Sequence, residues 1–585
     1  MRKFLFLVAA CALCAQGINA RVITPSQAEV IAKQQFVNPT RLNASNVKMN
    51  LSYVATNLKG QADYYVFNRE GGNGFVVVAG DDISSSVLAF GEKGSFDINK
   101  APEYLQYLFE QYQKNLEMVR KNPQLAPRTA PSFKMNPEGV KPMFLNEYGE
   151  GPHWDQFEPY NNYCPNTTSG RAYAGCAAVA FAHIMKGLQY PPQGHGEVSY
   201  TYMLNDQPMT VTDQIYRHSY RYSNSYMPNA VSASSTKWRD IAQLIFDAGA
   251  SFNTRYSASS SDASYKDIVK GMIAHFDYNP NIQFVLKQNY DEQTWREKMY
   301  TEIDSGRPIY YFGYRTISNT GAQCHIGHAF VIDGYNSEGM VRVIWGFQQN
   351  EYNSYFSFDL MSPRIYGDTP YEHDQKKEGF NADQGAIIGI RPALAGEPGG
   401  IVQKAVNLVA DIMPATDVRA TIDLAAYSGP WSGTLRCGIV SRNVNQSDNS
   451  VTYTTYYTFN REVTINEDSV ATIDVSGSYP MLSNGQTYYF VIWSPYFPNN
   501  YDWNWFLADP VPFTVGDWVN PPVDYEMGDV NHDGVINVAD VTALIQYVLG
   551  GEPAAPFYLD VADLNGDESY NVADVTELIQ LALNN

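Results

Sequence analysis

The spacing of apolar residues predicts helices and strands in the first part of the chain. Between residues 105 and 119, apolar side chains recur three or four positions apart, which places them on one face of a helix. These positions are Leu105, Leu108, Phe109, Tyr112, Leu116 and Val119. An apolar run at 75–79, bounded by glycines, is typical of a buried strand. Thr24-Pro25-Ser26-Gln27 matches a capping box, so a helix is expected to begin there. Residues 21–135 are therefore predicted to form a small α+β unit.

Changes of pattern along the chain predict the remaining domains. Five prolines between residues 123 and 142 indicate an extended, protease-accessible linker. Residues 136–395 mix helical and strand patterns and are rich in Tyr and Trp, so this block is the candidate catalytic domain. Residues 400–520 alternate Thr, Val and Tyr over strand-length runs, which favours a β-sandwich. The predicted fold class is α+β, with several domains in one chain.

The last segment, residues 524–585, contains an internal repeat. Asn537-Val538-Ala539-Asp540-Val541-Thr542 recurs 34 residues later as Asn571-Val572-Ala573-Asp574-Val575-Thr576. In both copies, oxygen-bearing side chains occupy alternate positions before a helical pattern. This arrangement lets a short loop supply the oxygen ligands that Ca²⁺ prefers.

Each loop supplies one set of expected calcium ligands. The first set is Asp529, Asn531, Asp533, the Val535 carbonyl, Asn537 and Asp540. The second set is Asp563, Asn565, Asp567, the Ser569 carbonyl, Asn571 and Asp574. Glu568 stands where such a loop prefers Gly, so the second site is expected to be weaker. The paired loop–helix repeat resembles a type I dockerin domain, which implies two calcium ions, calcium-dependent folding and a cohesin-type partner.

The N-terminal residues have the pattern of a secretory signal peptide. Arg2-Lys3 precedes an apolar run at 4–13, and a small residue stands at Ala20. Residues 1–20 are therefore excluded from the fold, and the product is expected to be secreted, extracellular or associated with the cell surface. A lipoprotein signal ending at Cys11 is the alternative. No later stretch reaches the ~18 unbroken apolar residues that a membrane helix needs.

The negative charge of the chain argues against nucleic-acid partners and favours cations. The 585-residue chain has 40 basic and 61 acidic residues, a net charge of −21, so it should repel the phosphate backbone of nucleic acids. Residues 521–585 contain 12 acidic residues and no Lys or Arg. This carboxylate-rich tail favours cations.

One of the mature cysteines is a candidate nucleophile. Removal of the signal leaves Cys164, Cys176, Cys324 and Cys437, too few for a disulfide scaffold. Cys176 begins an Ala-rich helical pattern, and a thiol at a helix N-terminus is expected to have a lowered pKa. From this segment alone, a small buried cysteine is the alternative. Whether Cys164 pairs with Cys324 or is simply buried stays open.

His328 is the candidate base. It begins an apolar strand bounded by glycines, and a returning strand follows at 340–345. A hairpin centred near Asn336-Ser337 places His328 opposite Trp345.

Several short motifs occur in a specific order between residues 141 and 346. They are Lys141-Pro142, His153-Trp154-Asp155-Gln156, Pro159-Tyr160-Asn161-Asn162, Gly175-Cys176, Ile184-Met185-Lys186, Gly327-His328-Ala329-Phe330-Val331-Ile332-Asp333-Gly334 and Trp345-Gly346. This order resembles the streptopain-like cysteine peptidases of the papain superfamily, and Gly74–Asp81 resembles the family's inhibitory propeptide. The resemblance covers roughly residues 21–395, and the β-sandwich region has no close match.

The resemblance assigns roles to individual residues. It implies that Cys176 is the nucleophile, that His328 is its base and later the general acid, and that Gln156 donates to the oxyanion beside the Cys176 amide. No cofactor is implied for catalysis. The family usually has Asn-Trp-Gly-Trp where this chain has Ile344-Trp345-Gly346-Phe347. Because Ile344 cannot hydrogen-bond a histidine, orientation of His328 is expected to depend on packing of Trp345 or on another acceptor.

These observations favour a secreted zymogen cysteine endopeptidase that acts on protein substrates. Residues 21–135 would block the cleft as an inhibitory propeptide until the linker is cut, with cleavage by the enzyme itself as the hypothesis. A catalytically impaired peptidase fold that serves as a surface binding or scaffold protein is the first alternative. A transglutaminase-like acyl transferase using the same two residues is the second.

Overall fold

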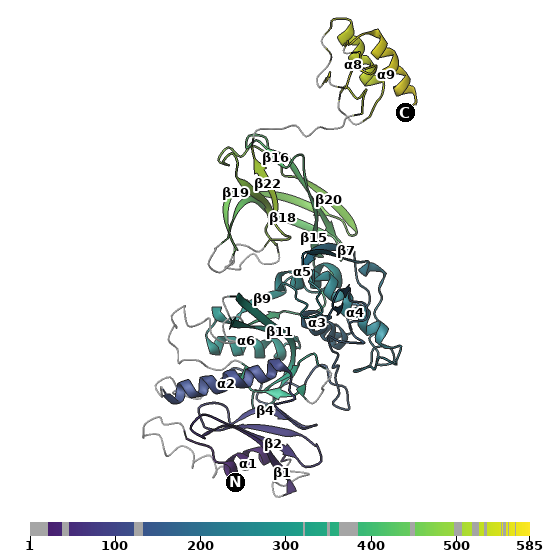
Figure 1. Cartoon of the computed structure of the whole chain (residues 1–585). Helices are drawn as coiled ribbons and strands as arrows, with labels where there is room; N and C mark the ends of the chain where they lie inside the picture. The colour runs from purple at the N-terminus through teal and green to yellow at the C-terminus, as the bar shows by residue number, and fades with distance from the viewer. Residues whose placement is uncertain are drawn as a thin grey trace. The chain divides into compact units, whose positions relative to one another are not determined.

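The protein is described by a computed structural model (Figure 1). The described residues are 21–37, 46–121, 133–319, 322–347, 352–361, 384–444, 451–495, 506–516, 526–531, 535–551, 553, 557–559, 561–567 and 569–584. The expected signal peptide and residues 123–132 of the expected linker lie outside them. The chain forms two compact units, the first with residues up to 407, 420–475 and 489–511, and the second with 408–419, 476–488 and 512–585.

The N-terminal part of the first unit is the small α+β unit that the apolar pattern predicts. Its elements are α1 (Pro25–Gln35), β1 (Met49–Thr56), β2 (Ala62–Arg69), β3 (Phe75–Ala79), β4 (Val87–Gly91) and α2 (Glu103–Lys121). Thr24 caps α1 in a reciprocal bond with Gln27, so the predicted capping box is confirmed. Strand β3 is fully buried, as its unbroken apolar sequence requires.

The candidate catalytic block alternates helices and strands. Its helices are α3 (Cys176–Leu188), α4 (Trp238–Ser251), α5 (Tyr265–Phe276), α6 (Glu292–Asp304) and α7 (Phe358–Met361), with short 3₁₀ turns η3 (Ile215–Arg217) and η4 (Lys287–Asn289). Its strands are β5 (Asn166–Thr167), β6 (Gly170–Arg171), β7 (Val198–Leu204), β8 (Gln207–Asp213), β9 (Gln283–Leu286), β10 (Ile309–Asn319), β11 (Ala322–Tyr335), β12 (Val341–Ile344), β13 (Tyr355–Phe356) and β14 (Gly385–Ile388).

One sheet joins the N-terminal unit to the catalytic block. Its ten strands run in the order β1-β2-β3-β4-β13-β12-β11-β10-β14-β9. The junction is an antiparallel pairing of β4 with β13, in which Ala89 faces Phe356 and Phe90 faces Tyr355. Next to it, Ser85 donates from both its backbone N–H and its hydroxyl to Asp359, at 2.7 Å each. The N-terminal unit is therefore attached by main-chain and charge-assisted hydrogen bonds as well as by apolar packing.

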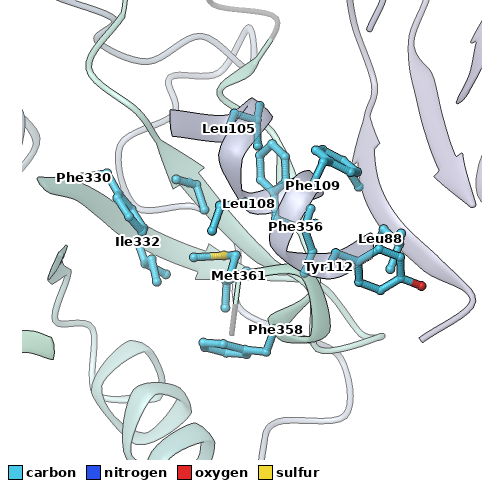
Figure 2. Packing of buried hydrophobic residues seen from close by; sticks show 14 of the residues in the cluster. Leu88, Leu105, Leu108, Phe109, Tyr112, Phe330, Ile332, Phe356, Phe358 and Met361 are labelled. Carbon is cyan, nitrogen blue, oxygen red and sulfur yellow. The ribbon is translucent and has the colours of Figure 1, made fainter. Parts of the chain in front are cut away.

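A large hydrophobic core is shared by the same two parts. Helix α2 contributes the apolar face predicted from its sequence, and the catalytic block contributes residues of β11, β13 and α7. Figure 2 shows Leu105, Leu108 and Phe109 of α2 beside Phe330 and Phe356. Because apolar burial is the main favourable term in folding, α2 and the sheet stabilise each other.

The region predicted as a β-sandwich is built of strands. They are β15 (Ile401–Leu408), β16 (Ile412–Met413), β17 (Ala420–Ala426), β18 (Trp431–Val444), β19 (Val451–Ile465), β20 (Ser469–Asp474), β21 (Thr487–Ile492) and β22 (Val511–Val515). In the first unit, β17 pairs with β20, and β18 pairs with β19 and β21. In the second unit, β16 pairs in parallel with β22. The strand pattern is thus confirmed for this region.

The second unit also contains the repeated C-terminal segment. Its helices are α8 (Val538–Val548) and α9 (Val572–Asn584), which pack around a small core that includes Leu544 and Leu578. These two leucines occupy equivalent places in the sequence repeat. Among the described residues, no helix is long and apolar enough to cross a membrane.

Candidate active site

Helix α3 begins at Cys176 because of the residue before it. Gly175 caps the helix with φ of 88°, a left-handed conformation that glycine adopts without steric cost. A Cβ at this position would lie 3.2 Å from the Ser261 carbonyl oxygen, so a larger residue would also be crowded. The turn fixes Cys176 at the first position of a helix whose following residues are buried.

The Cys176 sulfur is adjacent to the strand that carries the candidate base. The backbone N–H of Ala329, the residue after His328, donates a hydrogen bond to the sulfur. The expectation of a lowered thiol pKa is wrong for this structure, because burial raises the pKa of Cys176. The backbone donors of Ala329 and Ala177 favour the thiolate but do not outweigh the desolvation. The helix N-terminus therefore does not by itself produce a thiolate when the N-terminal unit is in place.

His328 has a defined tautomer. Its Nε2 lies 2.8 Å from the Trp345 carbonyl oxygen. Because a carbonyl can only accept, Nε2 carries the hydrogen and the neutral ring keeps Nδ1 as its basic nitrogen. Burial lowers the pKa of His328 to about 4, while the bond to Trp345 acts in the opposite direction. The ring is therefore neutral at pH 7.

The predicted hairpin register is wrong, although the contact between His328 and Trp345 exists. Val331 faces Ile344, and the pairing shifts between Ile332 and Gly334, where the strand has a bulge. The turn is centred on Glu338, later than predicted, which moves Trp345 out of the position opposite His328, and the bulge reverses this shift by only one residue. The imidazole reaches the Trp345 main chain instead of facing its side chain across the strands.

Aromatic rings hold the imidazole from several sides. The Phe347 ring is stacked on His328 with centroids 5.0 Å apart and planes 10° apart, and the Trp345 ring lies 6.4 Å away. The Trp345 backbone is itself fixed, because its N–H donates to Asn353 Oδ1 at 2.8 Å. The Trp345 carbonyl and the stacked rings thus orient His328. Ile344 cannot hydrogen-bond the imidazole, and these contacts take the place of that bond.

A tyrosine of the N-terminal unit covers this centre. Tyr104, in the first turn of α2, has its ring 5.0 Å from the His328 ring and 5.8 Å from the Trp345 ring. Burial raises the pKa of the Tyr104 phenol well above its usual value, and Cys176 is among the neighbouring groups that add to the shift. Tyr104 therefore lies beside both members of the candidate dyad, and it was not selected from the sequence.

Gln156 lies beside the segment that leads to Cys176. Its carbonyl accepts from the backbone N–H of Ala174, two residues before the cysteine, at 3.0 Å. The loop is anchored by Trp154, whose backbone N–H donates to Nε2 of His183 at 3.0 Å. His183 lies on α3, and burial lowers its pKa to about 3, so it stays neutral and able to accept. Nothing in the local sequence around His183 indicates this contact with Trp154.

The two predicted calcium loops repeat the same hydrogen bonds. Asp540, fully buried, accepts from the backbone N–H groups of Asn531 and Asn537 at 3.1 and 2.9 Å. Its counterpart in the second loop, Asp574, is equally buried. It accepts from Asn565 and Asn571 at 3.4 and 2.9 Å.

The calcium loops fit the cation by their donor chemistry. The described members are carboxylate, amide and main-chain oxygens, which is the donor set of a hard cation. The expected ligand Asp533, and Glu568 at the position that favours Gly, lie outside the described residues.

Other thiols have simpler surroundings. Cys164 and Cys437 are free and buried, and burial raises the pKa of Cys164 to about 12 and that of Cys437 to about 11. The side chain of Cys324 lies outside the described part of the chain. Of the three described cysteine side chains, only that of Cys176 is partly exposed.

Three family models match the chain. Residues 20–116 match the Spi protease inhibitor, residues 154–356 the peptidase C10 family, and residues 527–582 the dockerin type I domain. Residues 154–356 are thus similar to cysteine peptidases of family C10. The inhibitor match coincides with the unit that carries Tyr104, and the dockerin match coincides with the calcium loops.

Curated relatives agree with the family. The thiol protease/hemagglutinin PrtT of Porphyromonas gingivalis is 27% identical over 70% of this chain and 46% of its own length. The chain therefore spans about half of that relative. Streptopain of Streptococcus pyogenes is 26% identical over 64% of this chain and 92% of its own length.

Two solved structures from Prevotella intermedia match part of the chain. A prointerpain A fragment has 22% sequence identity and a TM-score of 0.47, covering 60% of this chain and 100% of the fragment. Active interpain A has 26% identity and a TM-score of 0.36, covering 44% of this chain and 98% of that one.

Proposed function

We propose that this C10 peptidase is secreted as a zymogen and cuts internal peptide bonds of protein substrates with Cys176 and His328. The observation that carries the assignment is the pair of contacts at this centre. The backbone of Ala329 donates to the Cys176 sulfur, and Nε2 of His328 is committed to the Trp345 carbonyl. The first contact places the thiol beside the histidine, and the second leaves Nδ1 as the base.

The reaction would proceed by acyl transfer. His328 Nδ1 takes the thiol proton, the Cys176 sulfur attacks the peptide carbonyl, and the imidazolium then protonates the leaving amine. Water, activated by the same nitrogen, hydrolyses the thioester and releases the second product. Gln156 and the Cys176 backbone N–H would donate to the oxyanion in both tetrahedral states. No metal or organic cofactor is needed for these steps.

Trp345 would act as a positioning residue. Its carbonyl fixes the tautomer of His328, and its ring supports the imidazole and contacts Phe330 at 4.7 Å. Asn353 holds the Trp345 main chain in turn. This arrangement supplies the orientation that an asparagine at position 344 would otherwise provide.

The N-terminal unit would inhibit the enzyme by covering the dyad. With Tyr104 against His328, both the thiol and the imidazole are held neutral, and the Tyr104 ring occupies space beside the dyad that a substrate would need. Cleavage in the proline-rich linker would release α2 from the shared core. We expect the enzyme to cut this linker itself, so a Cys176→Ala protein that matures normally on its own would contradict that part of the proposal.

The C-terminal repeat would bind two calcium ions and then a cohesin-type partner outside the cell or at its surface. The duplicated hydrogen bonds of Asp540 and Asp574 support two similar sites. Calcium titration should show two ions in the unchanged chain and one in the Asp574→Asn variant, with loss of helical signal when a chelator is added. A stoichiometry of one in the unchanged chain would exclude the second site.

Hydrolysis of denatured casein tests the catalytic assignment. After removal of the N-terminal unit by an added protease, the unchanged enzyme should release peptides under reducing conditions. The Cys176→Ala and His328→Ala variants should lose at least about a thousandfold in kcat/KM. Cys164→Ala is the matched control and should keep activity. Products that carry an added amine donor instead of water would favour the acyl-transferase alternative.

A further inference from the structure

A second cluster of ionisable side chains lies in the catalytic block, on elements other than those that carry the dyad. Asp213 ends β8, His218 follows η3, and Asp247 lies within α4. Nδ1 of His218 is 3.0 Å from Asp247 Oδ2 and 3.8 Å from Asp213 Oδ1. One atom from each residue can be chosen so that all three lie within 4.8 Å of one another.

The cluster is buried and incompletely satisfied. Asp247 is 0% exposed and Asp213 is 7% exposed. Asp213 Oδ2 is a buried atom without a hydrogen-bond partner among the described residues, whereas His218 Nδ1 is within hydrogen-bonding distance of Asp247 Oδ2. Two carboxylates this close, each removed from water, repel each other unless a cation or a shared proton lies between them. The unpartnered oxygen of Asp213 is therefore available as a ligand for a cation.

The distances fit a small metal ion. Zinc bonds to His nitrogen and carboxylate oxygen are about 2.0–2.1 Å long, and tetrahedral geometry then separates two ligand atoms by about 3.3–3.4 Å. The observed separations of 3.0 and 3.8 Å lie on either side of that value. An imidazole ligand favours zinc or a similar transition metal over Ca²⁺ or Mg²⁺, which prefer oxygen ligands.

Outer hydrogen bonds hold one of the carboxylates in place. The Tyr220 hydroxyl donates to Asp247 Oδ2 at 2.7 Å, and the Gln243 amide donates to Oδ1 at 2.6 Å. Ligating carboxylates in metalloproteins are commonly supported in this way. The support is therefore already present for Asp247.

The cluster opens onto a cavity. Asp213 and His218 line a cavity of about 550 Å³ together with Glu197, Ser199 and Arg217. The Arg217 guanidinium donates to the Tyr216 hydroxyl at 3.1 Å and lies over its ring, so this cation is engaged elsewhere. The cavity gives a metal ion a path of entry and leaves room for a water molecule as the fourth ligand.

We propose that Asp213, His218 and Asp247 bind one zinc-class divalent transition-metal ion, with water completing the coordination. The ion would tie the end of β8 and the turn η3 to helix α4. Helix α4 packs closely on α3, since a Cβ at Gly249 would lie 3.3 Å from the Ala178 side chain. A metal at this place would therefore brace the helix behind Cys176 without entering the reaction.

Cobalt binding provides a test with a readout other than activity. The full chain with Cys176→Ala removes the reactive thiol as a competing ligand, and excess Ca²⁺ fills the C-terminal loops. Titration with Co²⁺ should give one equivalent with the visible absorption of a four-coordinate site, and Zn²⁺ should abolish that absorption. Zn²⁺ should also raise the unfolding temperature of the protein, because it binds the folded state.

Three variants locate the ion. His218→Gln and Asp213→Asn should weaken Co²⁺ binding by at least about a hundredfold, and Tyr220→Phe should weaken it by about 10- to 100-fold. His195→Gln is the matched control, because His195 pairs with Asp277 at 2.7 Å outside the cluster. His218 is 28% exposed, so His218→Gln should still fold. Failure of the unchanged cluster to bind Co²⁺ below about 100 µM, or binding that His218→Gln leaves intact, would overturn the proposal.

Discussion

The ring of Tyr104 lies 5.0 Å from the ring of His328, although the two residues belong to different parts of the chain. Tyr104 also contacts the rings of Trp345 and Phe330, at 5.8 and 6.1 Å. One side chain of the N-terminal unit thus covers the proposed base and the residue whose carbonyl the His328 ring contacts. The same helix contributes the apolar face that joins the shared core (Figure 2).

Replacing Tyr104 should therefore expose the dyad. We expect the Tyr104→Ala zymogen to react with a thiol-alkylating epoxide at Cys176 at least about tenfold faster than the unchanged zymogen, and to mature sooner. Tyr112→Ala is the matched control, since Tyr112 is a buried tyrosine on the same helix that hydrogen-bonds Ser84. Both variants should lose about 3–5 kcal/mol of stability, the usual cost of removing a buried aromatic ring. Equal acceleration in both would mean that general loosening of α2 is responsible.

An asparagine at position 344 should not improve the enzyme. Ile344 is fully buried and faces Val331 across the strands, and His328 already donates to the Trp345 carbonyl. Ile344→Asn should therefore lower stability by about 1–3 kcal/mol, because a polar amide is buried without a prepared partner. The measurement is urea unfolding together with kcat/KM on casein. A rise in kcat/KM would show that the carbonyl does not replace the usual acceptor.

His183 is expected to position the loop that carries Gln156. Its Nε2 accepts from the Trp154 backbone N–H, and the rings of His183 and Trp154 are 5.5 Å apart. His183→Ala should lower kcat about 10- to 100-fold with little change in KM, because the oxyanion donor would lose its fixed position.

A buried histidine elsewhere separates this effect from destabilisation. His275 has its Nδ1 2.8 Å from a backbone carbonyl, and burial lowers its pKa to about 4. His275→Ala should destabilise the enzyme to a similar extent but leave kcat of the folded fraction close to that of the unchanged enzyme. A similar fall of kcat in both variants would contradict a positioning role for His183.

Protonation of His328 at low pH should lower the stability of the zymogen, in which Tyr104 covers the imidazole (the covered state). Its pKa is about 4 in this structure and 6.5 for an ordinary histidine, so the covered state favours the neutral ring. This contribution is fully present above pH 6.5 and is lost as the pH falls toward 4, which corresponds to at most about 3 kcal/mol. Urea unfolding of the Cys176→Ala zymogen between pH 7 and 4.5 should show the loss. Adding His328→Gln should reduce the pH dependence, and an unchanged slope would contradict this account.

The sequence predicts the elements more reliably than the contacts between distant segments. The apolar face of α2, the Thr24 capping box and the duplicated loops are local patterns, and each is present in the structure. The candidate dyad could also be proposed from the sequence, because Cys176 and His328 lie in short motifs of fixed order.

The features of the site that the sequence did not predict depend on tertiary structure. The turn after β11 is centred later than predicted and a bulge lies at residues 332–334, and nothing in the local pattern marks either feature. Tyr104, Asn353 and His183 reach the site only after distant segments pack together. The raised pKa of Cys176 has the same origin, since the folded chain buries the thiol.

Labelling of Cys176 before and after removal of the inhibitory unit tests the central claim most directly. The unchanged chain would be treated with a thiol-alkylating epoxide in reducing buffer at pH 7, as the intact zymogen and after cleavage of the linker, and the adduct located by mass spectrometry. We predict little adduct on the zymogen, rapid labelling of Cys176 after cleavage, and loss of casein hydrolysis in proportion to labelling. A Cys176 that stays unlabelled after cleavage, in a protein that does not hydrolyse casein, would contradict the account and favour a peptidase fold that only binds.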